Sequence, residues 1–339
     1  MNCVRIVAKS PGRCESLSQV GYLLGICLIT CSLAACVQAE KPETWEQRKA
    51  ERFRPITDAQ RMAIVEAVPD RATVASQQSR RVLVFYRCEG FIHTSIPHGN
   101  LATEQMGRKT GAFQIDLADN YDVFTKQNLR RYDAIVLNNT SRLKFPDPSQ
   151  EEALLDFVAG GKGLVGYHAA TDNFYAHPKA AAMMGGQFNG HPWGAGGTWA
   201  FRLDDSTHRL NAAFDGEGFW HQDEIYQYRP ETYQGPEVLR LLVSLDMTKR
   251  VVAEQVKNRR KAADTADELP QVPVSWVRRY GEGRVFVTNL GHREETFANP
   301  VVLRHMLDGI QFALGDLPAD TTPTAQAEPG GPVLAPAAP

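Results

Sequence analysis

Short apolar runs alternate with helical segments through the middle of this 339-residue chain, and this alternation restricts the fold more than any other feature. Strand-like runs lie at 82–86, 113–117, 133–138 and 164–168, with helical patterns around 101–109 and at 149–159. Successive parallel strands need a crossover connection, usually a helix, so this repeat is typical of strand–helix–strand units. The sequence therefore predicts an α/β domain with a mostly parallel sheet.

The second half of the chain contains more strand than helix. Further strands are expected at 199–203, 238–245, 251–255, 274–279 and 284–289. The last helix is well defined, because Asn299 caps it, Pro300 opens it and Gly315 follows it. For the helix at 149–159, Ser149 and Glu152 predict a capping box.

The amino terminus predicts export. Basic residues precede an uncharged stretch at 20–35, which is typical of a secretory signal. The stretch ends in Leu33-Ala34-Ala35-Cys36, which resembles a bacterial lipobox with Cys36 as the lipid-bearing residue. A cut after Ala39 would instead release a soluble protein. We expect a lipoprotein on the periplasmic face of a bacterial membrane, attached only by its lipid, or a protein secreted to the periplasm.

The chain divides by composition into four parts. We expect a lipoprotein signal peptide at 1–36, a polar spacer with short helices at 37–80, the α/β domain at 81–317, and a disordered tail rich in Pro and Ala at 318–339. Hydrophobic residues make up 43% and charged residues 22%, with a formal net charge of -2. This composition suits an ordinary globular chain and gives no sign of a nucleic-acid partner, while it leaves the oligomeric state open.

One cysteine lies in the body of the protein. Five of the six cysteines fall in or at the end of the leader, which leaves Cys88 alone after the first strand and excludes an internal disulfide framework. Cys88 could be a nucleophile, but free cysteines at strand ends are more often small apolar residues of the core.

Histidines are the main candidates for function. The segment from Gly160 to Asp172 leads through an apolar strand to His168, and His292 repeats this arrangement after the run at 284–290. Ligands of open α/β sheets collect at the carboxyl ends of the strands, so both imidazoles are expected at one crevice. In all, five of the nine histidines lie in predicted loops: His93, His168, His191, His221 and His292.

Imidazoles with a nearby carboxylate suit Zn²⁺ or another divalent ion, and they equally suit acid/base chemistry. No His-Glu-x-x-His spacing is present, so the sequence leaves both readings open. Our hypothesis places His168, His191 and His292 at a polar or metal-binding centre, with Glu224 or Asp223 as carboxylate partner.

The remaining candidate residues surround this centre. His93 and Asp172 are assigned acid/base or substrate-orienting roles, beside His168 and Glu224 as catalytic residues. Trp193, Tyr226 and Asp223 are assigned to substrate binding, because aromatic faces suit the apolar faces of sugar rings.

Several ordered motifs together resemble the ThuA-like, or trehalose-utilisation, family over roughly residues 81–315. They are Gly90-Phe91-Ile92-His93, Tyr132 to Val136, Gly161 to His168, Gly185 to Pro192, Asp223-Glu224-Ile225-Tyr226 and Gly283 to His292. The resemblance implies a fold similar to the class I glutamine amidotransferases, a flavodoxin-like three-layer α/β/α domain. Those enzymes carry a cysteine nucleophile at the strand–helix elbow, where this chain has His168, so the amidotransferase mechanism is not expected.

The resemblance also implies work on carbohydrates. ThuA-like proteins are associated with the catabolism of disaccharides oxidised to 3-keto sugars, and isomerisation, elimination or hydrolysis is the chemistry expected there. This chain departs from the family at Ile92, where an arginine typically precedes the histidine. The alternative is a non-catalytic lipoprotein that binds a saccharide or a partner, and convergence of the histidines on one point would favour the enzyme.

Overall fold

The computed structural model describes residues 44–259, 271–328 and 330–339. The signal peptide, Cys36 and the alternative cut after Ala39 lie outside these ranges, so the expectations about export are not addressed by the structure. Among the described helices, none combines the length and the apolar character that crossing a membrane requires.

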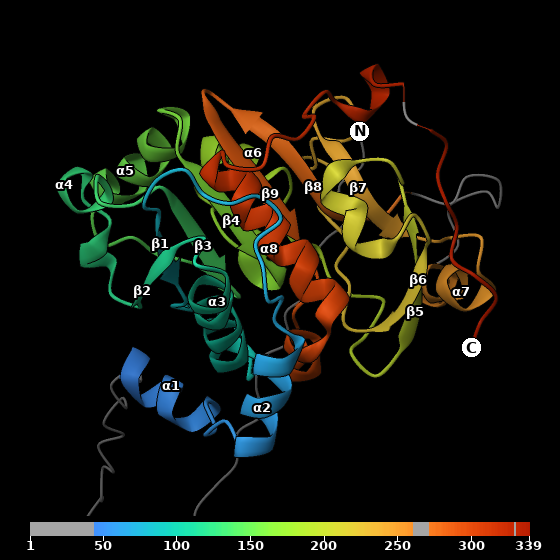
Figure 1. Ribbon diagram of the computed structural model, residues 1–339, viewed down its shortest axis with the longest axis horizontal. Coiled ribbons are helices and arrows are strands. Elements are labelled where there is room, and N and C mark those ends of the chain that lie inside the picture. The colour runs from blue at the N-terminus through green and yellow to red at the C-terminus, as the bar shows by residue number, and fades with distance from the viewer. Residues whose placement is uncertain (1–43, 260–270, 329) are drawn as a thin grey trace, which may run out of the picture. The chain divides into compact units, whose positions relative to one another are not determined.

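A nine-stranded sheet runs through the domain in the order β2-β1-β3-β4-β9-β8-β7-β5-β6 (Figure 1). The strands are β1 (Arg81–Phe85), β2 (Gln114–Ala118), β3 (Ala134–Asn138), β4 (Gly163–Tyr167), β5 (Thr198–Leu203), β6 (Phe219–Gln222), β7 (Arg240–Leu245), β8 (Pro273–Tyr280) and β9 (Gly283–Thr288). From β2 to β9 all neighbours are parallel, and from β9 to β6 all are antiparallel. The parallel half has the strand order of flavodoxin-like folds, which confirms the expected fold class.

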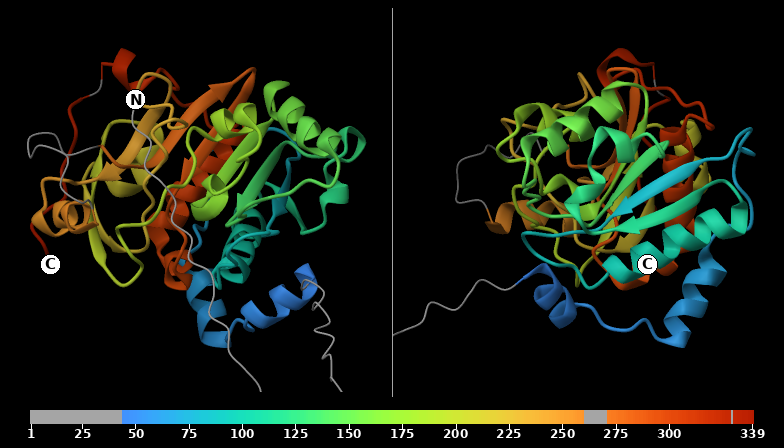
Figure 2. Two further views of the ribbon diagram at one scale, coloured as in Figure 1. Left: turned by 180° about the vertical axis from the view of Figure 1, so that it is seen from behind. Right: turned by 90° about the vertical axis from the view of Figure 1, so that its left-hand side faces the viewer.

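Helices cover both faces of the parallel half (Figure 2). They are α1 (Trp45–Arg52), α2 (Asp58–Ala67), α3 (Ile96–Thr110), α4 (Lys126–Leu129), α5 (Pro148–Ala159), α6 (Pro178–Met184), α7 (Arg250–Arg259) and α8 (Pro300–Leu314). Val82 and Val84 of β1 share a core with α3 and α8, whereas Leu83 and Phe85 share the opposite core with α5 and α6. The alternation of strand side chains thus builds two cores and three layers.

The helix ends follow local sequence signals. Asn299 caps α8 through its side-chain oxygen and Gly315 ends it at a φ of 83°, as predicted. The prediction for α5 was wrong by two residues. Asp147 is the cap there, and Gln150 completes the capping box in place of the Ser149–Glu152 pair, because Asp147 holds the extended backbone that a cap requires.

The strand expected at 251–255 is instead part of helix α7. Val252 and Val256 are buried and Val251 is exposed, which is a spacing of four rather than the alternation of a strand. The short strand β6 was not expected at all. Apolar runs of this length do not distinguish strand from helix, because only a few residues sample the period.

The segment at 318–339 is packed on the domain where the structure describes it, in contrast to the expected disorder. Val333 exchanges two backbone hydrogen bonds with Leu203 of β5, and the Ala335 amide donates to Asp246. Its composition predicts few apolar anchors, but backbone groups left open at the end of β5 accept this segment regardless of its side chains.

Candidate functional site

The site lies at the carboxyl edge of the parallel half. His93 follows β1, His168 follows β4 and His292 follows β9. His168 holds a φ of 43°, in the left-handed region that side chains other than glycine rarely adopt. Of the five such residues in the described ranges, four lie in segments that follow β3 or β4: Asn139, Arg142, His168 and Phe174. Strained backbone concentrated in this way is typical of functional sites.

Four side chains converge there. One ligand atom from each of His93, His168, Glu224 and His292 lies within 4.8 Å of the other three. His292 Nδ1 is 3.2 Å from Glu224 Oε1 and 3.3 Å from His168 Nε2, and His168 Nε2 is 3.7 Å from Glu224 Oε1. We refer to these four residues as the histidine cluster.

A backbone carbonyl fixes the orientation of the His168 ring. Its Nδ1 lies 2.8 Å from the backbone carbonyl of Asn289, so Nδ1 carries the proton and donates it. Nε2 consequently faces the cluster. A carbonyl behind an imidazole is the usual support of a metal-binding histidine.

Asp223 supports the loops that carry Glu224 and His292. Its side chain is fully buried and accepts hydrogen bonds from the backbone amides of Glu224, Gly291 and Arg293 and from the Thr296 hydroxyl. The structure therefore places this predicted substrate-binding residue behind the site, where it positions other groups.

The electrostatics of the cluster favour an ionised Glu224 beside a neutral His93. Although burial opposes it, hydrogen bonds from His168 and His292 hold the pKa of Glu224 below its usual value. Burial, followed by the charges of His168 and His292, lowers the pKa of His93 well below its usual value. Deprotonated carboxylate and neutral imidazole are the forms that bind a cation.

The cluster dimensions suit a small divalent cation. Zn²⁺ binds histidine nitrogen and carboxylate oxygen at about 2.0–2.2 Å, which separates the ligand atoms of a tetrahedral complex by roughly 3.3–3.6 Å. Three of the six separations, 3.2, 3.3 and 3.7 Å, lie near this range, and all six are within 4.8 Å. Three nitrogens and one oxygen form a donor set typical of Zn²⁺ and of other first-row divalent ions.

His191 takes a different position from the one expected. Its Nδ1 lies 3.1 Å from the second oxygen of Glu224, and its side chain is 47% exposed. His93 occupies the place in the cluster that the sequence hypothesis gave to His191. His191 therefore reaches the cluster from the solvent side, through Glu224.

Tyr226 and Asp172 border the cluster without belonging to it. The Tyr226 ring packs 4.4 Å from the His168 ring between centroids and is nearly buried. Asp172 is buried beside the turn after β4, where it accepts a hydrogen bond from the Tyr175 hydroxyl, and burial raises its pKa.

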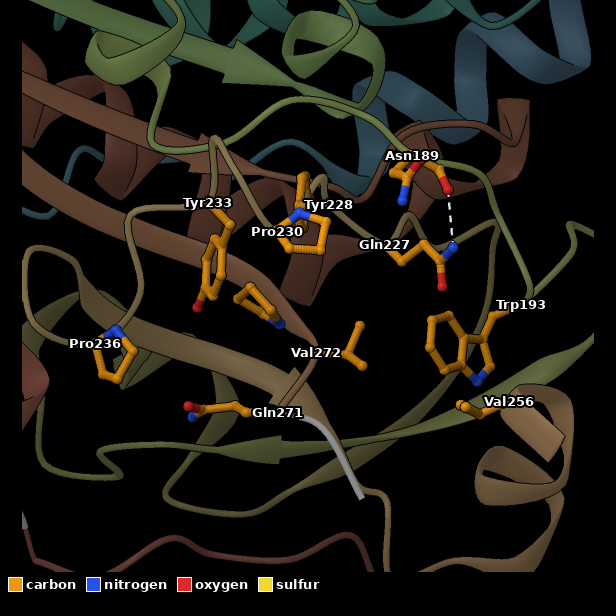
Figure 3. Close-up of a pocket in the computed structure, with 11 residues that line it drawn as sticks. Asn189, Trp193, Gln227, Tyr228, Pro230, Tyr233, Pro236, Val256, Gln271 and Val272 are labelled. Atoms are coloured by element: carbon orange, nitrogen blue, oxygen red, sulfur yellow. Dashed lines mark hydrogen bonds between the residues drawn. The ribbon is translucent and has the colours of Figure 1, made fainter. Parts of the chain in front are cut away.

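Trp193 lines a separate pocket with Tyr228 and Tyr233 (Figure 3). Phe188–Tyr228 and Trp193–Ile225 are antiparallel bridges, so the two segments form a short ribbon. Glu224 belongs to the cluster, whereas Trp193 donates from its indole to the Val252 carbonyl. The structure does not bring this predicted substrate-binding residue to the cluster.

The sequence hypothesis did not include two residues that lie beside His93. Phe91 is 56% exposed, and its ring meets that of His93 edge-on at 4.8 Å. The Arg52 guanidinium of α1 lies 4.9 Å from the Phe91 ring centre, and its Nε donates to the Ile92 carbonyl at 3.2 Å. Arg52 thus brings a cation to the Phe91–Ile92 segment beside His93. No local pattern links residue 52 to residue 91.

Cys88 is a core residue. It is fully buried against Ile92, its Sγ lies 3.2 Å from the Asn139 carbonyl, and burial raises the pKa of its thiol to about 12. A thiol of this kind does not ionise near neutral pH, so the structure gives no support to a cysteine nucleophile.

The family model for trehalose utilisation, ThuA, matches residues 81–313, and the chain belongs to this family. Two solved structures share the fold. A ThuA-like protein from Bacteroides uniformis is 18% identical with a TM-score of 0.53, covering 70% of this chain and 93% of that one. One from Parabacteroides merdae is 16% identical with a TM-score of 0.51, covering 74% and 96%. No curated protein matches the sequence.

Proposed function

We propose that this chain is a metal-dependent enzyme of carbohydrate catabolism that acts on oxidised sugars of the 3-keto-disaccharide type. The observation that carries the proposal is the convergence of His93, His168, His292 and Glu224 at distances that suit one divalent ion. The family match supports the carbohydrate substrate class, because this family is described by trehalose utilisation.

The reaction class follows from the chemistry that a keto group needs. Removing a proton next to a ketone requires a base and an electrophile for the developing enolate. A divalent ion held by the cluster would supply that electrophile by polarising the ketone oxygen. Elimination, isomerisation and hydrolysis of the glycoside are the outcomes that this chemistry supports.

His191 is the residue that moves the proton in this proposal. It is the most exposed histidine in contact with the cluster, and Glu224 Oε2 lies 3.1 Å from its Nδ1. This contact orients the imidazole, so that the opposite nitrogen is available to a substrate. Tyr226 packs against the His168 ring on one side of the site.

Conversion of 3-keto disaccharides by the purified chain, followed by NMR, tests the function. We expect wild type to convert the keto form and not the parent disaccharide, and His191→Gln to lower kcat by about 10²–10⁴-fold with metal content unchanged. His177→Gln, outside the cluster, is the matched control and should keep wild-type kcat. Keto-sugars recovered intact from metal-loaded wild type would contradict the proposal.

We further propose that the chain is exported and anchored by lipid at Cys36. The lipobox-like Leu33-Ala34-Ala35-Cys36 supports this. Radiolabelled palmitate should enter wild type and not Cys36→Ala. Equal labelling of both, or of neither, would contradict the anchor.

A further inference from the structure

A second pocket lies at the same edge of the sheet, after β3 and β4. It encloses about 450 Å³ and is lined by Arg142, Leu143, Lys144, Tyr175, Ala176 and Arg229. Half of these residues are cationic, and none is acidic. This charge pattern distinguishes it from the largely aromatic and amide-lined pocket beside Trp193.

Arg142 is held in an unfavourable backbone conformation. Its φ is 49°, in the left-handed region, and its amide donates to the Asp172 carbonyl at 2.6 Å. The side chain is 61% exposed, and Asp172 is its one carboxylate neighbour among the described residues, at 3.8 Å from Nε. Backbone strain is often found at ligand-binding segments, and this strained segment places Arg142 at the pocket.

Tyr175 gathers two guanidinium groups. Arg142 and Arg229 lie 5.5 Å and 4.9 Å from its ring centre, so both cations are held on one aromatic side chain. Arg229 Nε is buried and has no hydrogen-bond partner in the described part of the chain. The Arg229 side chain as a whole is 43% exposed, so the rest of its guanidinium is open to an anion in the pocket.

The carboxylates nearby do not balance these cations. Asp172 accepts from the Tyr175 hydroxyl, and Glu231, 3.7 Å from Arg229, has a side chain that is 66% exposed and therefore well solvated. Lys144 has no carboxylate within 4.0 Å among the described residues. Two arginine forks and a lysine suit the oxygens of a carboxylate or phosphate.

The pocket is close to the histidine cluster. The Tyr175 hydroxyl lies 3.4 Å from the Phe188 carbonyl, the Phe188 ring packs 4.4 Å from Tyr226, and Tyr226 packs 4.4 Å from His168. Phe188 and Tyr226 are thus the layer between the two sites.

We propose that Arg142, Lys144 and Arg229 bind the anionic group, carboxylate or phosphate, of an acidic saccharide. This inference rests on the proposed function for the sugar part of the ligand, whereas the anion site rests on the pocket alone. It assigns the substrate class an acidic group that the histidine cluster itself does not require.

Calorimetric titration of the full chain tests the inference with four probes: D-glucuronate, glucose 6-phosphate, D-glucose and inorganic phosphate. We expect at least one of the two acidic sugars to bind about tenfold or more tightly than glucose, because charge-assisted hydrogen bonds of this kind contribute strongly. Equal binding of glucose would overturn the proposal. Inorganic phosphate that binds as tightly as glucose 6-phosphate would overturn the saccharide part and leave a free-anion site.

Variants locate the binding. The variants Arg142→Gln, Arg229→Gln and Lys144→Gln should each lower the affinity for the acidic sugar by about tenfold or more. Arg142→Lys should have an affinity between those of wild type and Arg142→Gln. Arg250→Gln, whose side chain is 89% exposed on α7, is the matched control and should bind as wild type. Wild-type binding by all three pocket variants would refute the assignment.

His168→Ala separates this inference from the proposed function. Retained glucuronate binding in His168→Ala supports an anion site independent of the cluster, and lost binding would place the anion at the cluster instead. If the protein converts no keto-sugar but binds glucuronate through Arg142 and Arg229, the proposed function fails and the anion site stands.

Discussion

The two halves of the sheet contribute to the site in different ways. In the parallel half, from β2 to β9, His168 follows β4 directly, whereas His292 lies four residues after β9 and His93 eight residues after β1. The antiparallel half supplies Glu224 from the segment after β6, held in place by the buried Asp223. The parallel strands bring the imidazole-bearing segments to one edge of the sheet, while the position of the carboxylate depends on hydrogen bonds across the junction between the halves.

Glu224→Gln gives the largest expected effect, because it removes the one contribution of the antiparallel half to the cluster. Loss of a ligand should exceed the loss of an outer support, which typically costs about 10–100-fold, so we expect metal affinity to fall more than 100-fold. Competition with a fluorescent chelator measures this. The exposed Glu217→Gln is the control, and equal affinities in Glu224→Gln and wild type would show that the parallel half binds the ion alone.

Asp223→Asn should weaken metal binding by about 10–100-fold, because an amide cannot accept from all four donors that now face the carboxylate. The matched control is Asp246→Asn, which alters another fully buried aspartate of the antiparallel half. Both variants should lose stability in urea, and only Asp223→Asn should lose metal. An equal loss of metal in both would reduce the role of Asp223 to general stability.

Asp308→Asn probes α8, which covers the parallel half. Burial raises the pKa of Asp308 to about 6 from an ordinary value of 3.8, so the folded state holds a proton that the unfolded chain releases. Wild-type stability should therefore fall as pH rises from about 4 to about 6, by about 1–3 kcal/mol relative to Asp308→Asn. Urea unfolding of both proteins across this range measures the difference. Parallel pH profiles would contradict the assignment, and the exposed Glu237→Gln should leave the profile unchanged.

Removing residues 330–339 should have the smallest effect. It deletes the Val333–Leu203 pairing, the Ala335–Asp246 bond and the hydrogen bond from the Trp220 indole to the Pro336 carbonyl, at a net cost of about 1–2 kcal/mol after the ordering entropy of the segment is recovered. Metal affinity should stay within about twofold of wild type, because these contacts lie in the antiparallel half. A large loss of metal would mean that the two halves are coupled more tightly than the contacts indicate.

The sequence predicted the parallel half well and the antiparallel half less well. Strand–helix alternation located β1 to β4 and β9, and the abrupt end of β4 identified His168. Helix α7 was taken for a strand, and β6 was missed, because short runs do not reveal their period. The carboxyl-terminal segment was expected to be disordered because it is rich in Pro and Ala. Composition does not reveal that open backbone groups at the end of β5 can pair with it.

The candidate site shows the same division. Histidines beside strand ends were identifiable from local sequence, but which of His93 and His191 joins the cluster depends on loop paths. Glu224 and its neighbour Asp223 could not be told apart, because adjacent residues face opposite ways and the sequence does not say which way is inward. Arg52 and Arg142 are near the site only through tertiary contacts.

Metal content of the full chain, stripped and then reloaded with Zn²⁺, tests the central claim most directly. Elemental analysis after dialysis should find one equivalent of ion per chain in wild type and in the control His177→Ala, and close to none in His168→Ala. Absence of bound ion in wild type, or an equal content in His168→Ala, would contradict the claim that the cluster is a metal centre.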